Sequence, residues 1–273
     1  MKNFITPKEL HTLQAQGNLV IIDVRGKGPY EAGHIEGALA LDVERDLTKP
    51  VEAHGGRHPL PTKGDFAETL RRLGLTITST VVIYDDWMTG VGRLWWMLRY
   101  AGIENVKVLA GGIGRWQREG YPLTQAVTPN PAPSSFVPQW RENWLVSHDE
   151  VVALTASQEK ILVDVRAPER YRGEVEPLDP VAGHIPTAIN IYYELPYTAD
   201  GLKPEAELRE IFKPLLNSTK KTVLYCGSGI TAPIEMLAVD ELNIPVALYL
   251  GSFSDWTSYE NAVIATGTET MDD

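Results

Sequence analysis

Short apolar segments alternate with helix-like segments along the chain. The apolar runs are LVIID (19–23), VVIYD (81–85), VKVLAG (106–111), ILVDV (161–165), TVLYC (222–226) and VALYLG (246–251). Amphipathic segments such as DFAETLRRLG (65–74) and GRLWWMLRYAG (92–102) lie between them. Runs that are apolar on both faces and separated by helices are typical of strands in a parallel sheet covered by helices. The pattern therefore predicts an α/β fold.

The two halves of the sequence resemble each other segment by segment. The recurring pairs are LVIIDVR (19–25) with ILVDVR (161–166), AGHIEGA (32–38) with AGHIPTA (182–188), TVVIYDD (80–86) with TVLYCGS (222–228), and LAGGIGRW (109–116) with YLGSFSDW (249–256). The spacing is repeated as well, because Asp23 precedes Tyr84 by 61 positions and Asp164 precedes Tyr225 by 61. Such self-similarity indicates two copies of one structural unit.

A segment rich in proline and serine separates the two copies. It predicts a semi-extended linker over residues 124–142, between a domain at 1–123 and a second domain at 143–273. The copies differ by two insertions, around VEAHGGRHPLP (51–61) in the first and RGEVEPLDP (172–180) in the second. Because long loops often carry functional residues, these insertions are candidate parts of a site.

Charge and cysteine content narrow the classes of function. A formal net charge of -11 argues against nucleic acid or an anionic membrane surface as the main partner. No apolar run approaches the roughly 20 residues needed to span a bilayer, and residues 1–13 are typical of a capped helix start. The chain has one cysteine, so an intrachain disulfide cannot form. We therefore expect a cytoplasmic protein.

That single cysteine, Cys226, lies in the segment YCGSGITA between a predicted strand and a predicted helix that begins near Thr231. Ligands of open α/β sheets bind at this kind of position. The backbone N–H groups of the residues after it, Gly227, Ser228, Gly229 and Ile230, are expected to curl around the sulfur. Together with the helix N-terminus they would stabilise a thiolate, which predicts a reactive cysteine.

Two cysteine chemistries use a short loop of this kind. A phosphatase loop needs an arginine six positions after the cysteine to bind phosphate oxygens, and this chain has Ala232 there. A tighter loop with room for one more atom on the sulfur suits a persulfide. The sequence therefore favours sulfur transfer.

The segments CGSGITA, DVR, AGHI and GS-x-x-x-W together resemble the tandem-domain rhodanese family of sulfurtransferases, over about residues 5 to 265. CGSGITA is similar to the signature of its 3-mercaptopyruvate branch. The resemblance implies two tandem rhodanese-like domains, each a parallel sheet flanked by helices, with catalysis in the second and no cofactor or metal. The repeat independently supports catalysis in the second domain alone, because in the first domain Asp85 occupies the place of Cys226 and cannot carry sulfur. We interpret Asp85 and Asp86 as solvated carboxylates or helix caps.

The resemblance also implies residues that bind the donor. Arg170, in ERY, matches the family's substrate-binding arginine, and its planar fork suits a carboxylate. The place of the second arginine of the 3-mercaptopyruvate branch holds Leu178, and Arg172 either compensates for it or forms a surface ion pair. Thr231 is expected to cap the helix or, as the alternative, to donate to the outer sulfur of a persulfide.

A proton relay is implied in the same way. Ser228 matches the serine of a serine–histidine–acid relay, His58 matches the histidine, and Glu44, with Asp42 as the fallback, matches the acid. The alternative for His58 is a loop histidine bonded to backbone. His54 and His58 lack further ligands at a spacing suited to a metal. Residues repeated in both halves, such as His34 and His184, are expected to have structural roles.

The sequence thus predicts a sulfurtransferase that moves sulfur from 3-mercaptopyruvate through a Cys226 persulfide to a thiol or cyanide. Thiosulfate is the alternative donor. A non-catalytic sulfur carrier or redox sensor is the alternative of another class. The partners of this protein are expected to be small molecules, not nucleic acid or membrane. The oligomeric state is left open.

Overall fold

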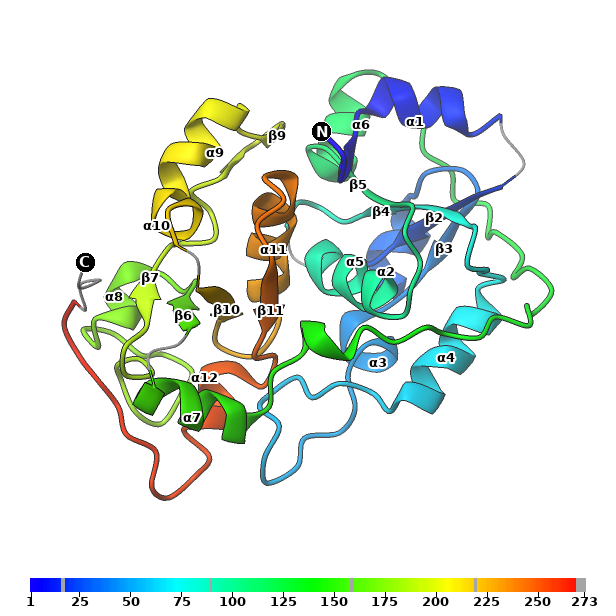
Figure 1. The fold of residues 1–273 in the computed structure, drawn as a ribbon. Helices are drawn as coiled ribbons and strands as arrows, with labels where there is room; N and C mark the ends of the chain where they lie inside the picture. The colour runs from blue at the N-terminus through cyan, green and yellow to red at the C-terminus, as the bar shows by residue number, and fades with distance from the viewer. Residues whose placement is uncertain (16–17, 89, 158–159, 219, 269–273) are drawn as a thin grey trace. The chain divides into compact units, whose positions relative to one another are not determined.

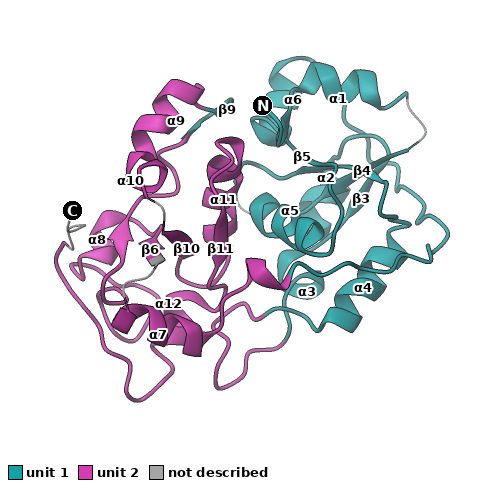
Figure 2. Ribbon diagram, in the orientation of Figure 1, with its two compact units in different colours: residues 1–49, 60–141, 197–202 teal, residues 50–59, 142–196, 203–273 magenta. Residues whose placement is uncertain are grey.

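The computed structural model describes residues 1–15, 18–88, 90–157, 160–218 and 220–268, and the chain divides into two compact units (Figures 1 and 2). Unit 1 comprises residues 1–49, 60–141 and 197–202, and unit 2 comprises residues 50–59, 142–196 and 203–273. Residues 197–202 thus belong to unit 1 and residues 50–59 belong to unit 2. The units therefore differ from the continuous domains 1–123 and 143–273 that the sequence predicts.

Unit 1 contains a five-stranded parallel sheet in the order β1-β5-β4-β2-β3. Its strands are β1 (Phe4–Ile5), β2 (Leu19–Asp23), β3 (Ala38–Ala40), β4 (Thr80–Tyr84) and β5 (Val106–Leu109). A separate antiparallel pair is formed by β8 (Tyr197–Thr198) and β9 (Gly201–Leu202). The three long central strands of the sheet are the apolar runs that the sequence predicted in the first half.

The helices of unit 1 flank this sheet. They are α1 (Pro7–Leu13), α2 (Lys27–Ala32), α3 (Val43–Asp46), α4 (Lys63–Arg72), α5 (Val91–Tyr100) and α6 (Gly112–Arg118). The predicted helix start near the N-terminus is confirmed, since Thr6 caps α1 and Glu9 completes a capping box. Side chains from alternate strand positions, such as Ile21 and Val82, pack with Leu10 of α1 and Trp116 of α6 in one buried cluster.

Unit 2 contains a four-stranded parallel sheet in the order β11-β10-β6-β7. Its strands are β6 (Lys160–Asp164), β7 (Ile189–Asn190), β10 (Lys221–Tyr225) and β11 (Val246–Leu248). Its helices are η1 (Glu142–Trp144), α7 (His148–Ser157), α8 (Pro168–Tyr171), α9 (Glu205–Ile211), α10 (Lys213–Leu216), α11 (Ala232–Glu241) and α12 (Ser252–Trp256). The predicted α/β class, with helices around two parallel sheets, is confirmed.

The register of the second sheet determines which loops meet. Strands β6 and β10 are neighbours, and Asp164 pairs with Tyr225 at their carboxyl ends. Leu162 and Val223 of these strands pack with Leu154 of α7 and Phe253 of α12, which anchors that face of the sheet. The loop after β6 therefore lies beside the loop after β10.

The proline-rich segment packs on unit 1 through specific contacts. Phe136 is buried, and the N–H of Gln139 donates to the carbonyl of Ala101 at 2.9 Å. Extended backbone with tertiary hydrogen bonds explains why this segment shows no periodicity in sequence. Within the described ranges, no helix is both long enough and apolar enough to cross a membrane.

Candidate active site

Cys226 lies at the carboxyl edge of the unit 2 sheet, directly after β10. Helix α11 begins at Ala232, with Thr231 at its N-cap, close to the predicted start, and Pro233 lies in its first turn. The Cys226 side chain is buried, and the Gly229 N–H donates to its sulfur at 3.1 Å. Gly229 has φ +80°, a left-handed conformation that favours glycine. The loop therefore bends back so that a backbone donor faces the sulfur.

The surroundings of the thiol favour its ionised form. Burial raises the pKa of Cys226, but hydrogen bonds from the Thr231 hydroxyl, from the N–H groups of Ala232 and Ser228, and from the Ser252 hydroxyl outweigh burial. The pKa of Cys226 therefore lies below its ordinary value. Because the thiolate is the nucleophilic form, this arrangement increases the reactive fraction of the sulfur at a given pH.

The structure differs in two details from the predicted set of donors around the Cys226 sulfur, which we call the cradle. The expectation that the Thr231 side chain caps α11 is wrong, since the side chain makes no cap hydrogen bond and its hydroxyl is directed to Cys226 instead. Ala232, which the sequence suggested only as a helix residue, contributes a backbone donor. For Gly227 and Ile230, donation to a sulfur species stays a prediction.

Ser252 is a site residue that sequence reasoning missed. Its hydroxyl accepts from the Cys226 N–H at 3.1 Å and has one proton to donate, either to the Cys226 sulfur at 3.6 Å or to the Tyr249 carbonyl at 3.0 Å. It is fully buried and has φ +60°, which is unusual for a residue other than glycine. The repeat contained a signal, because Ser252 aligns with Gly112 of the first half.

His58 and Ser228 lie together in unit 2. The Nδ1 atom of His58 is 2.8 Å from the Ser228 hydroxyl, and Ser228 directly follows the loop glycine Gly227. His58 therefore bonds to a side chain, whereas the alternative interpretation was a loop histidine bonded to backbone. The relay role of the pair stays a prediction, supported by this distance.

The segment 50–59 that carries His58 is anchored to α12 and the residues around it. Its Gly55 N–H donates to Asp255 at 2.7 Å, and its Arg57 N–H donates to Ser254 at 3.1 Å. A Cβ atom at Gly56 would lie 2.4 Å from the Gly251 carbonyl oxygen, so this close approach requires glycine. The insertion seen in the first half of the sequence is therefore an integral part of unit 2.

The acid expected to complete the relay lies in unit 1. Glu44 is a residue of α3, and Asp42 caps the same helix by accepting from the Arg45 N–H at 3.0 Å. Support of His58 by Glu44 or Asp42 stays a prediction.

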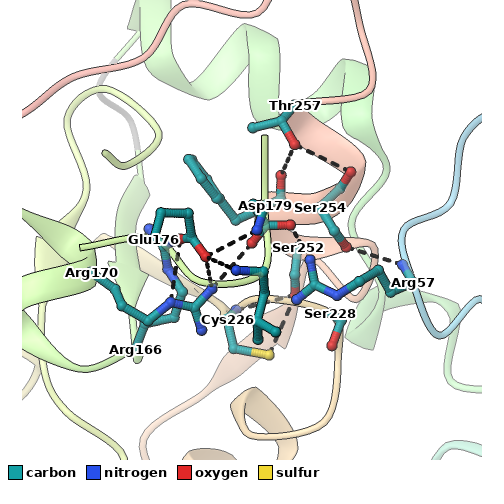
Figure 3. A network of polar contacts seen from close by, with 12 residues as sticks. Arg57, Arg166, Arg170, Glu176, Asp179, Cys226, Ser228, Ser252, Ser254 and Thr257 are labelled. Carbon is teal, nitrogen blue, oxygen red and sulfur yellow. Dashed lines mark hydrogen bonds and ion pairs between the residues drawn. The ribbon is translucent and has the colours of Figure 1, made fainter. Parts of the chain in front are cut away.

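A cluster of arginines and carboxylates lies beside the cysteine loop (Figure 3). Arg170 of α8 donates to Glu176 at 2.6 Å and to Asp179 at 3.2 Å. Arg57 forms an ion pair with the other oxygen of Asp179. Arg57 and Asp179 were missed by the sequence analysis, although Arg57 directly precedes His58 and Asp179 belongs to the second insertion.

Hydrogen bonds hold this cluster in place. Burial raises the pKa of Glu176, but hydrogen bonds from Arg170 and from the N–H groups of Leu178 and Asp179 outweigh burial, so its pKa lies below the usual value. Burial raises the pKa of Asp179 although Arg57 and Arg170 act against it. Arg166, which is paired with Asp164, also reaches Glu176 at 3.1 Å.

The side chains of Arg172 and Leu178 lie outside this cluster. Arg172 pairs with Glu174 at 2.7 Å, and both side chains are exposed. Leu178 is 62% exposed and contributes no charge. In the part of the chain that the structure describes, no group of three or more histidine, cysteine, aspartate or glutamate residues is arranged to hold a metal ion.

Known proteins are similar to this chain in sequence and in fold. A family model described as the rhodanese-like domain matches residues 6–119 and 147–259. The chain is 35% identical to the "Putative thiosulfate sulfurtransferase SseB" of Mycobacterium tuberculosis over 97% of both chains. It is 36% identical to the "Probable 3-mercaptopyruvate sulfurtransferase" of Pseudomonas aeruginosa, over 96% of this chain and 98% of that one.

Among solved structures, the chain is similar to SseA from Escherichia coli, described as having the rhodanese fold of 3-mercaptopyruvate sulfotransferases. The TM-score is 0.79 at 29% sequence identity, over 93% of this chain and 100% of that one. The family model covers most of both halves, and the two sequence relatives match nearly the whole chain. The protein therefore belongs to the rhodanese family, with one rhodanese-like domain in each half of its sequence.

Proposed function

We propose that the protein is a sulfurtransferase that takes sulfur from 3-mercaptopyruvate on Cys226 and passes it to a thiol or cyanide. The observation that carries this proposal is the cradle around the Cys226 sulfur, in which backbone and hydroxyl donors lower the pKa of a buried thiol. A persulfide anion built on the same sulfur would be stabilised by the same donors.

The proposed first step balances without any other reactant. The Cys226 thiolate attacks the thiol sulfur of the donor, a sulfur–sulfur bond forms, and the donor's carbon–sulfur bond breaks. Its electron pair stays on carbon as the enolate of pyruvate, and the proton of the donor's thiol is transferred to that carbon. The product is pyruvate and an anionic persulfide on Cys226.

In the second step an acceptor attacks the outer sulfur and regenerates the thiolate. A thiolate acceptor becomes a persulfide, and cyanide becomes thiocyanate. Ser228 and His58 are the groups proposed to move the proton in the first step, since their side chains lie within hydrogen-bonding distance of each other and Ser228 is the second residue after Cys226. Small-molecule partners and a cytoplasmic location remain part of this proposal.

Thiosulfate is the second candidate donor, favoured by the name of the Mycobacterium tuberculosis relative. Its leaving group, sulfite, departs as a stable anion and needs positive charge more than it needs a proton. The two residues after Cys226 are Gly227 and Ser228, neither of them cationic. This composition favours 3-mercaptopyruvate.

The proposal is tested by sulfur loading and by steady-state rates with both donors. Incubation with 3-mercaptopyruvate alone should add one sulfur atom to the intact protein, removable by cyanide, and Cys226→Ser should abolish both this adduct and turnover. The kcat/KM should be higher for 3-mercaptopyruvate than for thiosulfate by about ten-fold or more, because the complex with thiosulfate would lack one charge-assisted hydrogen bond. A single burst without further turnover would instead indicate a sulfur carrier.

The relay is tested separately with a matched pair of histidines. His58→Ala and Ser228→Ala should lower kcat for 3-mercaptopyruvate by about 10²-fold, the usual contribution of proton transfer, and should affect thiosulfate less. His54→Ala is the control, because His54 lies in the same segment but bonds to Ser258. Unchanged 3-mercaptopyruvate turnover in Ser228→Ala would refute the relay and leave the persulfide cysteine as the only assigned group.

A further inference from the structure

The segment that follows β7 borders the site on the side opposite to residues 50–59. In the strand order β11-β10-β6-β7, Cys226 follows β10, and residues 50–59 are anchored to Ser254 and Asp255, which lie beyond β11. Residues 191–196 follow β7, two strands from β10 on the other side, which is about 10 Å at the usual spacing of strands. Because the strands are parallel, these segments share the carboxyl edge of the sheet, where ligands bind.

Hydrogen bonds fix the start of the segment after β7. The Tyr193 N–H donates to the Val165 carbonyl at 3.1 Å. The Val165 N–H donates in turn to the carbonyl of Tyr225, directly before Cys226, at 3.0 Å. The side-chain amide of Asn190 donates to two carbonyls of the segment around Val165 at 2.8 and 2.9 Å. Tyr193 is therefore held at a defined distance from the cysteine loop, with the chain at Val165 between them.

Two tyrosines hold a carboxylate in this segment. The Tyr193 hydroxyl donates to Oε1 of Glu194 at 3.0 Å, and the rings of Tyr192 and Tyr193 pack edge to face with centroids 5.1 Å apart. Burial raises the pKa of Tyr193 to about 12, and a hydrogen bond with Glu194 and the negative charges of Glu194 and Cys226 act in the same direction. Burial and a hydrogen bond with Glu194 also raise the pKa of Tyr192. Both phenols therefore stay protonated at neutral pH and hold the exposed Glu194 side chain.

Glu194 adds a negative charge on this side of the sulfur. The arginines of the cluster beside the cysteine loop are already paired with carboxylates, among them Arg166 with Asp164 and Arg170 with Glu176. Because a carboxylate repels an anionic donor, Glu194 is unsuited to donor binding. The acceptor reaches the same sulfur after the donor has left, and a positively charged acceptor is attracted by Glu194.

We propose that Glu194, positioned by Tyr192 and Tyr193, is a specificity-determining residue for the sulfur acceptor and selects thiols that carry an ammonium group close to the sulfur over anionic thiols. The acceptor thiolate attacks the outer sulfur of the Cys226 persulfide, the bond between the two sulfurs breaks, and its electron pair returns to Cys226. The ammonium group stays charged throughout and pairs with Glu194. This inference rests on the proposed function, because it names the acceptor class of the same cysteine.

Steady-state rates with two thiols of similar size and opposite charge test this assignment. The probes are cysteamine and 3-mercaptopropionate, with 3-mercaptopyruvate as the donor. Glu194→Gln should lower the ratio of kcat/KM for cysteamine to that for 3-mercaptopropionate by about three- to ten-fold, as expected when one partly exposed charge acts on acceptors of opposite sign. Glu207→Gln, at an exposed position on α9, is the matched control and should change this ratio less than about two-fold. An unchanged ratio in Glu194→Gln would overturn the assignment.

Tyr193→Phe tests the positioning role. This variant keeps the packing of the ring and removes the hydroxyl that donates to Glu194. The ratio of kcat/KM for cysteamine to that for 3-mercaptopropionate should fall, by less than in Glu194→Gln, because the carboxylate remains but is held less firmly. A purely structural role would lower both values in the same proportion. That proportional loss, or an unchanged ratio, would refute Tyr193 as a positioning residue.

Reaction of Cys226 with charged disulfides separates this inference from the sulfur-transfer proposal. The thiolate attacks one sulfur of a symmetrical disulfide, a mixed disulfide forms, and the other half leaves as a thiolate. Because the chain has one cysteine, the intact-protein mass reports this reaction alone. Glu194→Gln should lower the ratio of the rate with cystamine to that with 3,3′-dithiodipropionate by about three- to ten-fold.

The two proposals fail in different ways. A fall of the disulfide rate ratio in Glu194→Gln, in a protein that takes up no sulfur from 3-mercaptopyruvate, would support charge selection by Glu194 and refute the proposed function. Sulfur loading of Cys226 with a disulfide rate ratio unchanged by Glu194→Gln would refute the selection alone.

Discussion

The two units build the same turn at the carboxyl edge of their sheets and place different groups in it. In unit 1 the Ile113 N–H donates to the carbonyl of Asp85 at 2.9 Å, and in unit 2 the Phe253 N–H donates to the carbonyl of Cys226 at 2.9 Å. The residue before each donor has nearly the same left-handed φ, +58° at Gly112 and +60° at Ser252. The backbone frame is therefore common to both units.

The side chains in this frame differ in chemistry. Asp85 is buried, and one of its carboxylate oxygens accepts from the N–H groups of Gly90 and Val91 at 2.8 and 3.3 Å, at the start of α5. Of the two expected roles, capping is therefore correct for Asp85 and a solvated position is wrong, whereas Asp86 is exposed. Unit 1 fills its cradle with a fixed carboxylate, and unit 2 fills the equivalent cradle with a thiol that can gain a second sulfur.

Other repeated residues support the frame in both units. His34 and His184 bond through Nδ1 to the carbonyls of Tyr30 and Tyr171 at 2.8 and 2.7 Å. Each histidine also stacks on the ring of the same tyrosine. Repetition in the unit without a cysteine indicates a structural role, in agreement with their exclusion from the site.

The largest test of this comparison moves the cysteine to unit 1. In the variant Cys226→Ser with Asp85→Cys, sulfur uptake should be absent and turnover at least about 10³-fold below wild type, since a cysteine alone does not make an activated nucleophile. A second cause is that unit 1 has Asp86 where unit 2 has Gly227, and a carboxylate repels an anionic donor. The measurement is intact-protein mass after donor treatment. Cyanide-removable sulfur on the new cysteine would show that the two loops are equivalent.

A smaller effect is expected from making unit 2 like unit 1 at one position. Ser252→Gly suits the positive φ but removes a hydroxyl that lowers the pKa of Cys226, so the pKa of the thiol should rise. The iodoacetamide alkylation rate should then reach its half-maximum at a pH higher by up to about one, given about 0.5–1.5 kcal/mol for one hydrogen bond. Thr257→Val removes a nearby hydroxyl that bonds to the Phe253 carbonyl and should leave this profile unchanged. A midpoint unchanged by Ser252→Gly would contradict the role of Ser252.

The smallest effect on turnover is expected in unit 1 itself. Asp85→Ala should lower stability by about 1–2 kcal/mol, as loss of a helix cap does, and should leave kcat/KM within a few-fold of wild type. Asp86→Ala, at an exposed position, should change stability by less than about 0.5 kcal/mol. Thermal unfolding and steady-state rates measure the two effects. A loss of several hundred-fold in turnover with the fold intact would mean that unit 1 takes part in catalysis.

Much of the fold and part of the candidate site could be predicted from local sequence. The apolar runs predicted the long strands, since continuous hydrophobic segments between helices reflect burial on both faces of a parallel sheet. Strands of two residues, such as β1 and β7, were not predicted, because so short a segment carries no periodic signal. Cys226 was identified because its glycines and hydroxyl residues are unsuited to an apolar core.

The sequence by itself determined the repeat, the strand-to-helix position of Cys226 and the loss of the cysteine from the first half, because each depends on neighbouring residues. Only the tertiary structure decided that residues 50–59 pack into unit 2, where Arg57 pairs with Asp179 and His58 reaches Ser228. These pairs are more than 100 positions apart, and no local pattern specifies which distant loop a surface insertion will contact. Ser252 could not be identified from the sequence for the same reason. Its role depends on a left-handed backbone angle and on a hydrogen bond to Cys226, which is 26 positions away.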